Sequence, residues 1–201
     1  MPKFTIVVPA RHEQHVIARC LDSMKRQSFK DFECICVVED LDTANAAREC
    51  TADDRRFNVI YGADEASFMP GNASASRNIA IDRASGEFVV FADADDWLED
   101  NALQVLQEAI AAHPDEQIVQ FSLKRLNAKQ EASIIQSCSG VRKIEDKDFF
   151  SGLLTHTASK AVKRSLIDEN GIRFCTKTSR SEDKLFWLQA ALAAKSYVGL
   201  S

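Results

Sequence analysis

The sequence Phe88-Val89-Val90-Phe91-Ala92-Asp93-Ala94-Asp95-Asp96-Trp97 runs from an apolar segment directly into an acidic one. Its aromatic and β-branched first half predicts a buried strand. The three carboxylates that follow repel one another unless a positive charge lies among them. Oxygen ligands suit Mg²⁺ or Mn²⁺, and such an ion can also hold substrate phosphates. The residues alone leave two interpretations open, a metal site and a solvated acidic turn at the start of a helix.

Strands and helices alternate before this segment. Short apolar runs predict strands, and apolar residues at helical spacing predict helices from Glu13 onward and in two later segments. Pro9 is expected to end the first strand, and Gly86 to cap the third helix. This alternation predicts right-handed βαβ units and an α/β fold with a mainly parallel sheet. The predicted strands are Phe4–Val8, Phe32–Val38, Phe57–Tyr61 and Glu87–Ala92, and the two later helices are Ala44–Cys50 and Asn72–Ala84.

The second half of the chain is less regular. It predicts four helices, one strand and a hairpin: Ala102–Ala112, Asp146–Leu154, Ser165–Asn170 and Glu182–Ala194; Gln117–Leu123; and Asn127–Gly140. We find no internal repeat, low-complexity tract or linker in the sequence. Residues 1–201 are therefore expected to form a single domain.

Composition excludes several classes of protein. A chain of 201 residues with 45% hydrophobic and 27% charged residues is typical of a globular domain. A net charge of -5 argues against nucleic acid as a partner. No apolar run is long enough to span a membrane, and the N-terminal run is too short for a signal peptide, so a cytoplasmic location is expected. The six cysteines include no C-x-x-C pair and are interpreted as reduced, small apolar residues.

Ligands of parallel α/β sheets gather at the carboxyl ends of the strands. This rule points to three segments of the chain: Pro9-Ala10-Arg11, Glu39-Asp40 and Asp93–Asp96. A carboxylate in the second segment could accept hydrogen bonds from a nucleobase or ribose, or could be merely solvated. No P-loop and no G-x-G-x-x-G motif is present, which excludes the usual ATPase and dinucleotide-binding interpretations.

Two further segments have both a functional and a structural interpretation. Small residues from Gly71 to Ser76 precede Arg77, which suits an anion site at a helix N-terminus or a plain helix start with a surface arginine. Glu182 and Asp183 begin the last predicted helix. One of them could be a general base, or both could simply be favourable charges at a helix N-terminus.

In this order, the segments resemble the family 2 glycosyltransferases, which have the GT-A fold. Each motif alone is weak, but the ordered combination is specific and spans almost the whole chain. The residues that carry the resemblance are Pro9–Glu13, Cys20–Met24, Gln27–Glu33, Val37–Asp40, Ser76–Ala80, Gly86–Leu98, Ser159–Arg164, Glu169–Phe174 and Glu182–Phe186.

The resemblance implies a Rossmann-like, mainly parallel sheet flanked by helices. Approximately residues 1–98 would form the nucleotide-sugar-binding half, and approximately residues 99–201 would form the acceptor-side half. It also implies roles for single residues: a nucleotide pocket lined by Pro9, Ala10, Arg11 and Glu13, base recognition by Asp40, diphosphate contact by Arg77, ribose contact by Asp93, ligation of Mn²⁺ or Mg²⁺ by Asp95 (the D-x-D motif), and deprotonation of the acceptor by Asp183.

The implied activity is metal-dependent, inverting transfer of one sugar from a nucleoside diphosphate donor, with UDP-sugar as the first choice. The acceptor would be a hydroxyl of a saccharide or lipid-linked saccharide in polysaccharide or glycoconjugate synthesis, which leaves peripheral membrane association open. The chain departs from the family at Arg11-His12, where Tyr-Asn is usual, and at Leu41, where glycine is common and allows backbone angles that leucine does not. These departures motivate an alternative, a nucleotide-sugar-binding protein without turnover. A nucleotidyltransferase is disfavoured, because no Gly-rich phosphate loop follows the first strand.

Overall fold

The computed structural model describes residues 1–126, 132–136, 139–146, 150, 153, 157–178 and 181–200. Its strands are β1 (Phe4–Ala10), β2 (Phe32–Val38), β3 (Phe57–Tyr61), β4 (Phe88–Phe91), β5 (Ile118–Gln120), β6 (Leu123–Leu126), β7 (Ala132–Gln136), β8 (Gly140–Lys143), β9 (Lys160–Lys163) and β10 (Ser196–Gly199). Its helices are α1 (Ile17–Lys25), α2 (Leu41–Thr51), α3 (Ala73–Arg83), α4 (Ala102–Ala112), α6 (Arg164–Glu169) and α7 (Glu182–Ala194), with 3-10 turns at Gly62–Asp64 and Thr157–Ser159.

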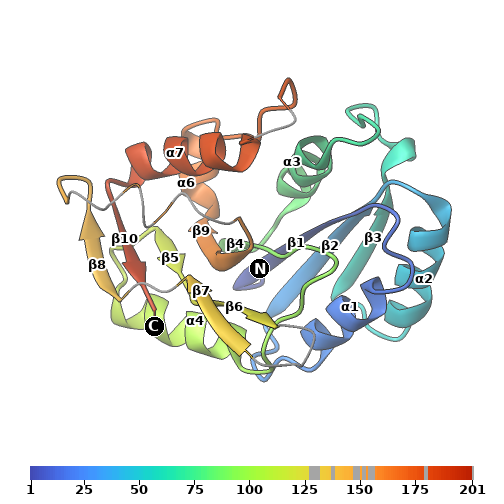
Figure 1. Cartoon of the computed structure of the whole chain (residues 1–201), viewed down its shortest axis with the longest axis horizontal. Helices are drawn as coiled ribbons and strands as arrows, with labels where there is room; N and C mark the ends of the chain where they lie inside the picture. Colours follow the sequence, from blue (N-terminus) through green and yellow to red (C-terminus); the bar gives the residue numbers. More distant parts are fainter. Residues whose placement is uncertain are drawn as a thin grey trace.

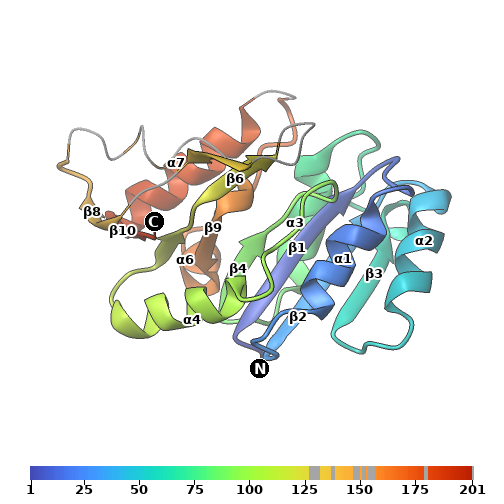
Figure 2. The same ribbon diagram turned by 60° about the horizontal axis from the view of Figure 1, so that its bottom comes forward.

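Eight of the strands form one continuous sheet with helices on both faces (Figure 1). The strand order is β3-β2-β1-β4-β9-β5-β10-β8, and β6 and β7 form a separate two-stranded sheet (Figure 2). Among the helices that the structure describes, none has the length and apolar character that crossing a membrane requires.

The first half of the sheet is parallel, as the sequence predicts. β1 lies between β2 and β4, and β3 pairs with the outer edge of β2. β1, β2 and β4 are almost wholly buried, which explains their uninterrupted apolar sequences. The prediction that Pro9 ends the first strand is wrong, because β1 continues to Ala10. Pairing with β4 stops at Val7, so Pro9, which has no N–H group, lies where β1 has only β2 as a partner.

The second half of the sheet is mixed. β9 runs antiparallel to both β4 and β5, β10 is parallel to β5, and β8 is antiparallel to β10. The predicted strand Gln117–Leu123 is divided between β5 and the beginning of β6, with a break at Phe121 and Ser122. The predicted hairpin Asn127–Gly140 contains only one complete strand, β7, which pairs with β6 just before the predicted range; residues 127–131 and 137–138 lie outside the described residues. Most of the predicted helix Asp146–Leu154 also lies outside them.

The helices divide between the two faces of the sheet, and each face has its own hydrophobic core. α1, α2 and α4 pack on one face, and α3, α6 and α7 pack on the other (Figure 1). On the second face, the ring of Phe91 meets three other rings edge-on, those of Phe174, Phe186 and Trp187. This aromatic cluster joins the end of β4 to α7, which lies about ninety residues later in the chain.

The five cysteines that the structure describes are free, as predicted. Cys20, Cys34 and Cys36 are buried in the core beneath α1. Burial raises the pKa of the Cys20 thiol to about 12 and also raises those of Cys34 and Cys36. These thiols therefore act as apolar core residues.

Gly86 has a different role from the predicted helix cap. The cap residue of α3 is Ala84, whose backbone is extended, and the backbone of Gly86 is not left-handed. Gly86 instead passes so close to β1 that a Cβ atom on it would lie 2.5 Å from the backbone nitrogen of Thr5. Its N–H group donates to the Thr5 hydroxyl at 2.9 Å. Only glycine allows the chain to enter β4 at this distance from β1.

Gly86→Ala should therefore destabilise the protein by about 1–3 kcal/mol, the usual cost of overpacking a core. Chemical denaturation of wild type and variant, fitted with a common m-value, measures the change in the free energy of unfolding. Gly171→Asn is the control, because a Cβ at Gly171 would meet no described atom within 4 Å, and asparagine tolerates its positive φ of 61°. Equal stability of Gly86→Ala and wild type would show that the close approach to β1 is not a constraint.

Candidate active site

The predicted site residues come together at the carboxyl edge of the parallel half-sheet. β1, β2 and β4 point in the same direction, so Arg11, Glu39 and Asp93 follow strand ends at one edge. Ala10 itself is buried in the core, and its carbonyl accepts the N–H of Glu39 at 3.0 Å. Backbone and side chains from separate segments thus form one continuous rim.

Glu39 ties this rim to the start of α3, a contact that the sequence did not single out. Its side chain is only 7% exposed and accepts the backbone N–H of Gly71 at 2.6 Å. The Ser76 hydroxyl lies 3.4 Å from its other oxygen, and Arg11 Nε lies 3.6 Å away. The sequence signal for this role was an acid at the end of a buried strand. Glu39 therefore holds the Gly71 turn and the Arg11 guanidinium in place.

Asp40 is the N-cap of α2. Its Oδ1 accepts the N–H of Thr43 at 3.0 Å, and its Oδ2 accepts the N–H of His12 at 2.7 Å. Partial burial raises the pKa of Asp40, but these hydrogen bonds outweigh burial and lower it overall. His12 has a φ of 60°, a left-handed conformation that histidine and asparagine adopt more readily than most residues. Leu41 begins α2 and is not among the residues with positive φ, so the change from glycine at this position causes no backbone strain.

Glu13 faces the same rim from the loop after β1. It accepts a hydrogen bond from the backbone N–H of Arg11. Burial raises the pKa of Glu13, and the negative charges of Asp95 and Asp40 raise it further. The carboxylates of Asp95 and Asp40 therefore make Glu13 harder to ionise.

Arg77 lies beneath the loop that follows β4, Asp93–Asp96, called the acidic loop below. Its residue is 8% exposed, its Nη2 donates to Asp93 Oδ1 at 3.0 Å, and the guanidinium carbon lies 5.3 Å from the centroid of the Phe174 ring. Its Nε is buried without a hydrogen-bond partner among the described atoms. The sequence predicted Arg77 at an anion site, and the anion that it holds in this structure is Asp93.

Buried polar groups of α1 and of Gln27, just after it, fix the loop that follows β4. The Ser23 hydroxyl accepts the N–H of Leu98 at 3.1 Å, and Gln27 bonds the backbone of Glu99 and Leu103 at 2.7 and 3.0 Å. Arg19 donates to the carbonyl of Asp95 at 2.8 Å and stacks on the ring of Trp97. The backbone of the loop is thereby held while the side chain of Asp95 stays exposed.

The acidic loop and α7 meet in a pocket of about 140 Å³, called the acidic pocket below. Although the loop and α7 lie far apart in the sequence, both supply carboxylates to it. Asp183 Oδ1 also accepts the N–H of Lys184 at 2.8 Å. The residues that line the pocket are Arg77, Asp93, Asp96, Leu123, Thr157, Ala158, Glu182 and Asp183.

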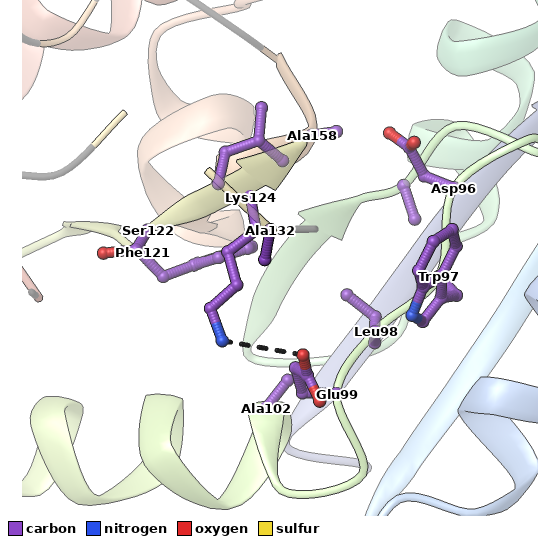
Figure 3. A pocket seen from close by; sticks show the side chains of 12 residues that line it. Asp96, Trp97, Leu98, Glu99, Ala102, Phe121, Ser122, Lys124, Ala132 and Ala158 are labelled. Carbon is purple, nitrogen blue, oxygen red and sulfur yellow. Dashed lines mark ion pairs between the residues drawn. The ribbon is translucent and has the colours of Figure 1, made fainter. Parts of the chain in front are cut away.

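A second, mainly apolar cavity of about 310 Å³ adjoins the acidic pocket, because both are lined by Asp96, Leu123 and Ala158. Trp97 and Leu98 form one wall and Phe121 lies opposite them (Figure 3). Lys124 reaches across the opening toward Glu99, with 3.6 Å between the charged atoms (Figure 3). This cavity offers an aromatic surface beside a carboxylate-rich pocket.

The acidic loop provides the kind of donor that a hard cation prefers. Asp93, Asp95 and Asp96 supply carboxylate oxygens within four residues, and the Asp95 side chain is open to solvent. Within the described part of the chain, no three His, Cys, Asp or Glu side chains converge closely enough to hold an ion by themselves. The donor set fits a magnesium or manganese ion whose remaining ligands come from substrate phosphates and water.

The family model "Glycosyl transferase family 2" matches residues 5–170. The chain belongs to this family. The match includes the ends of β1, β2 and β4 and the start of α3, and thus all of the predicted nucleotide-side residues. Asp183 lies beyond the matched range.

Several bacterial glycosyltransferases are similar over nearly the whole chain. A poly(ribitol-phosphate) beta-glucosyltransferase of Bacillus spizizenii is 30% identical over 198 residues, which cover 96% of this chain and 30% of the relative. The poly(ribitol-phosphate) beta-N-acetylglucosaminyltransferase TarS of Staphylococcus aureus is 25% identical over 205 residues, which cover 100% of this chain and 34% of TarS. The chain thus spans about a third of the length of these relatives.

Solved structures share the fold. A crystal structure of S. aureus TarS 1-349 in complex with UDP superposes with a TM-score of 0.84 at 23% identity, covering 99% of this chain and 58% of that one. A mannosyltransferase from Pyrobaculum calidifontis in complex with GDP-Man and Mn²⁺ superposes with a TM-score of 0.68 at 22% identity, covering 98% and 54%. This similarity confirms the GT-A fold that the sequence predicts.

The cap made by Asp40 generates a prediction about stability. Asp40→Ala should lower the free energy of unfolding by about 1 kcal/mol, the usual value of an N-cap. Because the pKa of Asp40 is lowered in the folded state, this contribution is present above its unfolded pKa and is lost as the pH falls through the folded value. Urea denaturation at neutral and acidic pH measures the difference. Asp40→Asn is the control, since asparagine caps helices equally well. If Asp40→Asn destabilised the protein as much as Asp40→Ala does, the proposed capping role of Asp40 would be contradicted.

Proposed function

We propose that the chain transfers a sugar from a UDP-sugar to a hydroxyl group of a bacterial surface polymer, with inversion at the anomeric carbon and with the help of Mn²⁺ or Mg²⁺. The observation that carries this proposal is the acidic pocket. It brings Asp93 and Asp96, which follow a parallel strand, together with Asp183 on α7. A donor bound along the strand ends would present its sugar to a carboxylate on another element.

The choice of UDP rests on relatives. TarS has been crystallised with UDP and with UDP-GlcNAc, and the sequence relatives are named as a glucosyltransferase and an N-acetylglucosaminyltransferase. In this chain, residues 1–98 would bind the nucleotide, with Asp40 accepting a hydrogen bond from the base. Pro9, Ala10, Arg11 and Glu13 would line the base and ribose pocket at the end of β1.

Asp93 and Arg77 would act together at the ribose and diphosphate. Asp93 is 43% exposed in its side chain and Arg77 is 10% exposed, so Asp93 faces solvent and Arg77 supports it from below. The buried Arg77 Nε retains a donor for which the described residues provide no acceptor. This geometry suits a ribose contact by Asp93 and an electrostatic contribution by Arg77 to the diphosphate.

A divalent cation would be held by Asp95, with the neighbouring carboxylates of the loop. When bound, it neutralises negative charge on the leaving diphosphate. Arg19 and the buried polar groups of α1 hold the loop backbone, so the Asp95 carboxylate is presented without rearrangement of the loop. The manganese ion in the mannosyltransferase complex supports this proposal.

Inversion requires the acceptor hydroxyl to attack from the face of the sugar opposite the leaving group. Sugar hydroxyls are very weak acids, so the attack needs a carboxylate within hydrogen-bond reach. Asp183 would take this proton, because it lines the acidic pocket across from Asp93 and Asp96. The neighbouring Glu182 lines the same pocket and would position the acceptor or the helix end.

The acceptor would approach through the apolar cavity, which belongs to residues 99–201 for most of its lining. The relatives act on poly(ribitol-phosphate), by their names, which supports a polymer with free hydroxyls as acceptor. The sequence contains no Gln-x-x-Arg-Trp motif of processive synthases, which supports transfer of single sugars. The reaction would then take place in the cytoplasm, at the inner face of the membrane for a lipid-linked acceptor.

Asp95→Ala should abolish the part of UDP binding that depends on Mn²⁺ and leave the melting temperature of the ligand-free protein unchanged, because the side chain is exposed on a loop. Calorimetric titration with UDP, with and without Mn²⁺, measures both affinities. Asp100→Ala, on the same loop but directed at Arg26, is the control. A wild-type protein whose UDP affinity is the same with and without Mn²⁺ would remove the metal from the proposal.

Asp183→Asn should keep UDP and metal binding but slow sugar transfer by about 10²-fold or more, as expected when a general base is lost. Glu182→Gln should slow transfer less. Release of UDP in the presence of an acceptor measures the rate, and calorimetry confirms that donor binding persists. Transfer by Asp183→Asn at near wild-type rate would place the base elsewhere.

The alternative, a nucleotide-sugar-binding protein without turnover, was motivated by Arg11, His12 and Leu41. Two of these changes fit the fold well, since His12 suits its left-handed backbone and Leu41 begins a helix. Turnover of a UDP-sugar by the wild type, lost in Asp183→Asn, would exclude this alternative. Binding without turnover of any donor would favour it.

A further inference from the structure

A lysine is fully buried against α7, the helix that carries Asp183. Lys160, the first residue of β9, has no exposed surface and is among the largest fully buried side chains of the described residues. A buried ammonium is costly unless opposite charge or other polar partners compensate for the loss of water. The proposed mechanism does not use this group, and its place in the fold therefore needs an explanation.

The direction of Lys160 follows from the strand. Side chains alternate along β9, and Val162 packs in the core on the face covered by α3, α6 and α7, whereas Ala161 packs on the opposite face. Lys160 therefore points to the same face as Val162. Its Nζ lies 4.9 Å from the centroid of the Trp187 ring on α7.

Trp187 relates this ammonium to Asp183. The two residues are four apart on α7 and so lie on the same side of the helix, one turn from each other. The negative charge of Asp183 acts on Lys160. Thr157 and Ala158, just before β9, line the same acidic pocket as Asp183. Lys160 therefore follows a segment that lines the pocket, and Asp183 lines the same pocket.

The N-terminus of α7 has no side-chain cap of its own. Its N-cap residue, Ser181, has a φ of 61° and makes no capping hydrogen bond with its side chain. The hydrophobic core holds α7 through Phe186 and Trp187, one turn further along. The first turn, with Glu182 and Asp183, thus lies between an uncapped end and the buried core.

We propose that Lys160 is a positioning residue, whose buried ammonium packs on Trp187 and so holds α7 with the Asp183 carboxylate directed into the acidic pocket. This inference rests on the proposed function, in which Asp183 receives the acceptor proton. Lys160 touches neither donor nor acceptor and acts only through Asp183 and Trp187.

The other groups around the pair are consistent with this role. Arg77, Asp93, Asp96 and Glu182 line the acidic pocket together with Asp183, and Lys184 follows it on the helix. Around Lys160, the Ser159 hydroxyl lies 3.4 Å from Nζ, β5 pairs through the uncharged Gln120, and α6 contributes the buried Leu166 and Ile167. Burial lowers the pKa of Lys160 to about 7, and the negative charge of Asp183 opposes this shift.

Lys160→Met tests the role in transfer. The kcat should fall about tenfold or more because Asp183 is displaced, while the KM for the donor stays the same. Lys163→Met, at the other end of β9, is the control and should change neither. An unchanged kcat would overturn the proposal.

Stability separates this effect from unfolding. Replacing a buried charge with an apolar side chain of similar length is often neutral or stabilising, so Lys160→Met should melt at the same temperature as wild type or higher. The folded pKa of Lys160 lies below its unfolded value, so its protonation destabilises wild type most at or below neutral pH. The stability difference should therefore shrink as the pH rises toward the unfolded lysine value. A variant that melts lower and whose KM for the donor rises along with the fall in kcat would assign Lys160 a purely structural role.

Fluorescence tests the pair without any turnover. Trp187 is one of two tryptophans, so its emission can be followed alone in a Trp97→Phe background. Emission should titrate near neutral pH, Lys160→Met should abolish the titration, and Asp183→Asn should move its midpoint to lower pH. An unmoved midpoint in Asp183→Asn would overturn the pairing. If no UDP-sugar is turned over, the proposed function fails while this titration still decides the pairing.

Discussion

The position of β1 between two parallel partners is the constraint on which the site depends. β1 pairs with β2 through its whole length and with β4 through its first four residues. Gly86 allows β4 to enter close to Thr5, where a Cβ atom would clash with the backbone of β1. Because the three strands are parallel, their carboxyl ends lie at one edge of the sheet. Arg11, Glu39 and Asp93, which follow these ends, are therefore close together.

The carboxylates at this edge differ in their partners, and these differences separate their roles. Glu39 is buried and bonded to the backbone of Gly71, so it is part of the scaffold. Asp40 caps a helix, and Asp93 rests on a buried arginine. Asp95 is exposed, on a loop whose backbone α1 holds from below. A run of similar residues in the sequence is thus divided into structural and ligand-accessible groups by the surrounding hydrogen bonds.

Most of the first half of the fold could be predicted, since buried parallel strands and amphipathic helices have strong local patterns. Phe32–Val38, Phe57–Tyr61 and Ala102–Ala112 were predicted with the bounds that the structure has. β8, β9 and β10 were missed because they are four-residue segments whose pairing, with partners far along the chain, gives little local signal. The same holds for the site. The acids at strand ends could be predicted, because ligands of parallel sheets gather at the carboxyl ends of strands. The role of Glu39, the anchoring by Ser23 and Gln27, and the burial of Lys160 could not, because they depend on contacts between distant segments.

The central claim is that the carboxyl edge of β1, β2 and β4 binds a uridine diphosphate together with a divalent cation. A thermal-shift comparison of UDP, GDP, CDP and ADP, each with and without Mn²⁺, tests it most directly, because a ligand that binds the native state raises the melting temperature. The account predicts that UDP with Mn²⁺ gives the largest increase and that omitting Mn²⁺ reduces it. Equal melting temperatures with all four nucleotides, or no response to any of them, would contradict it.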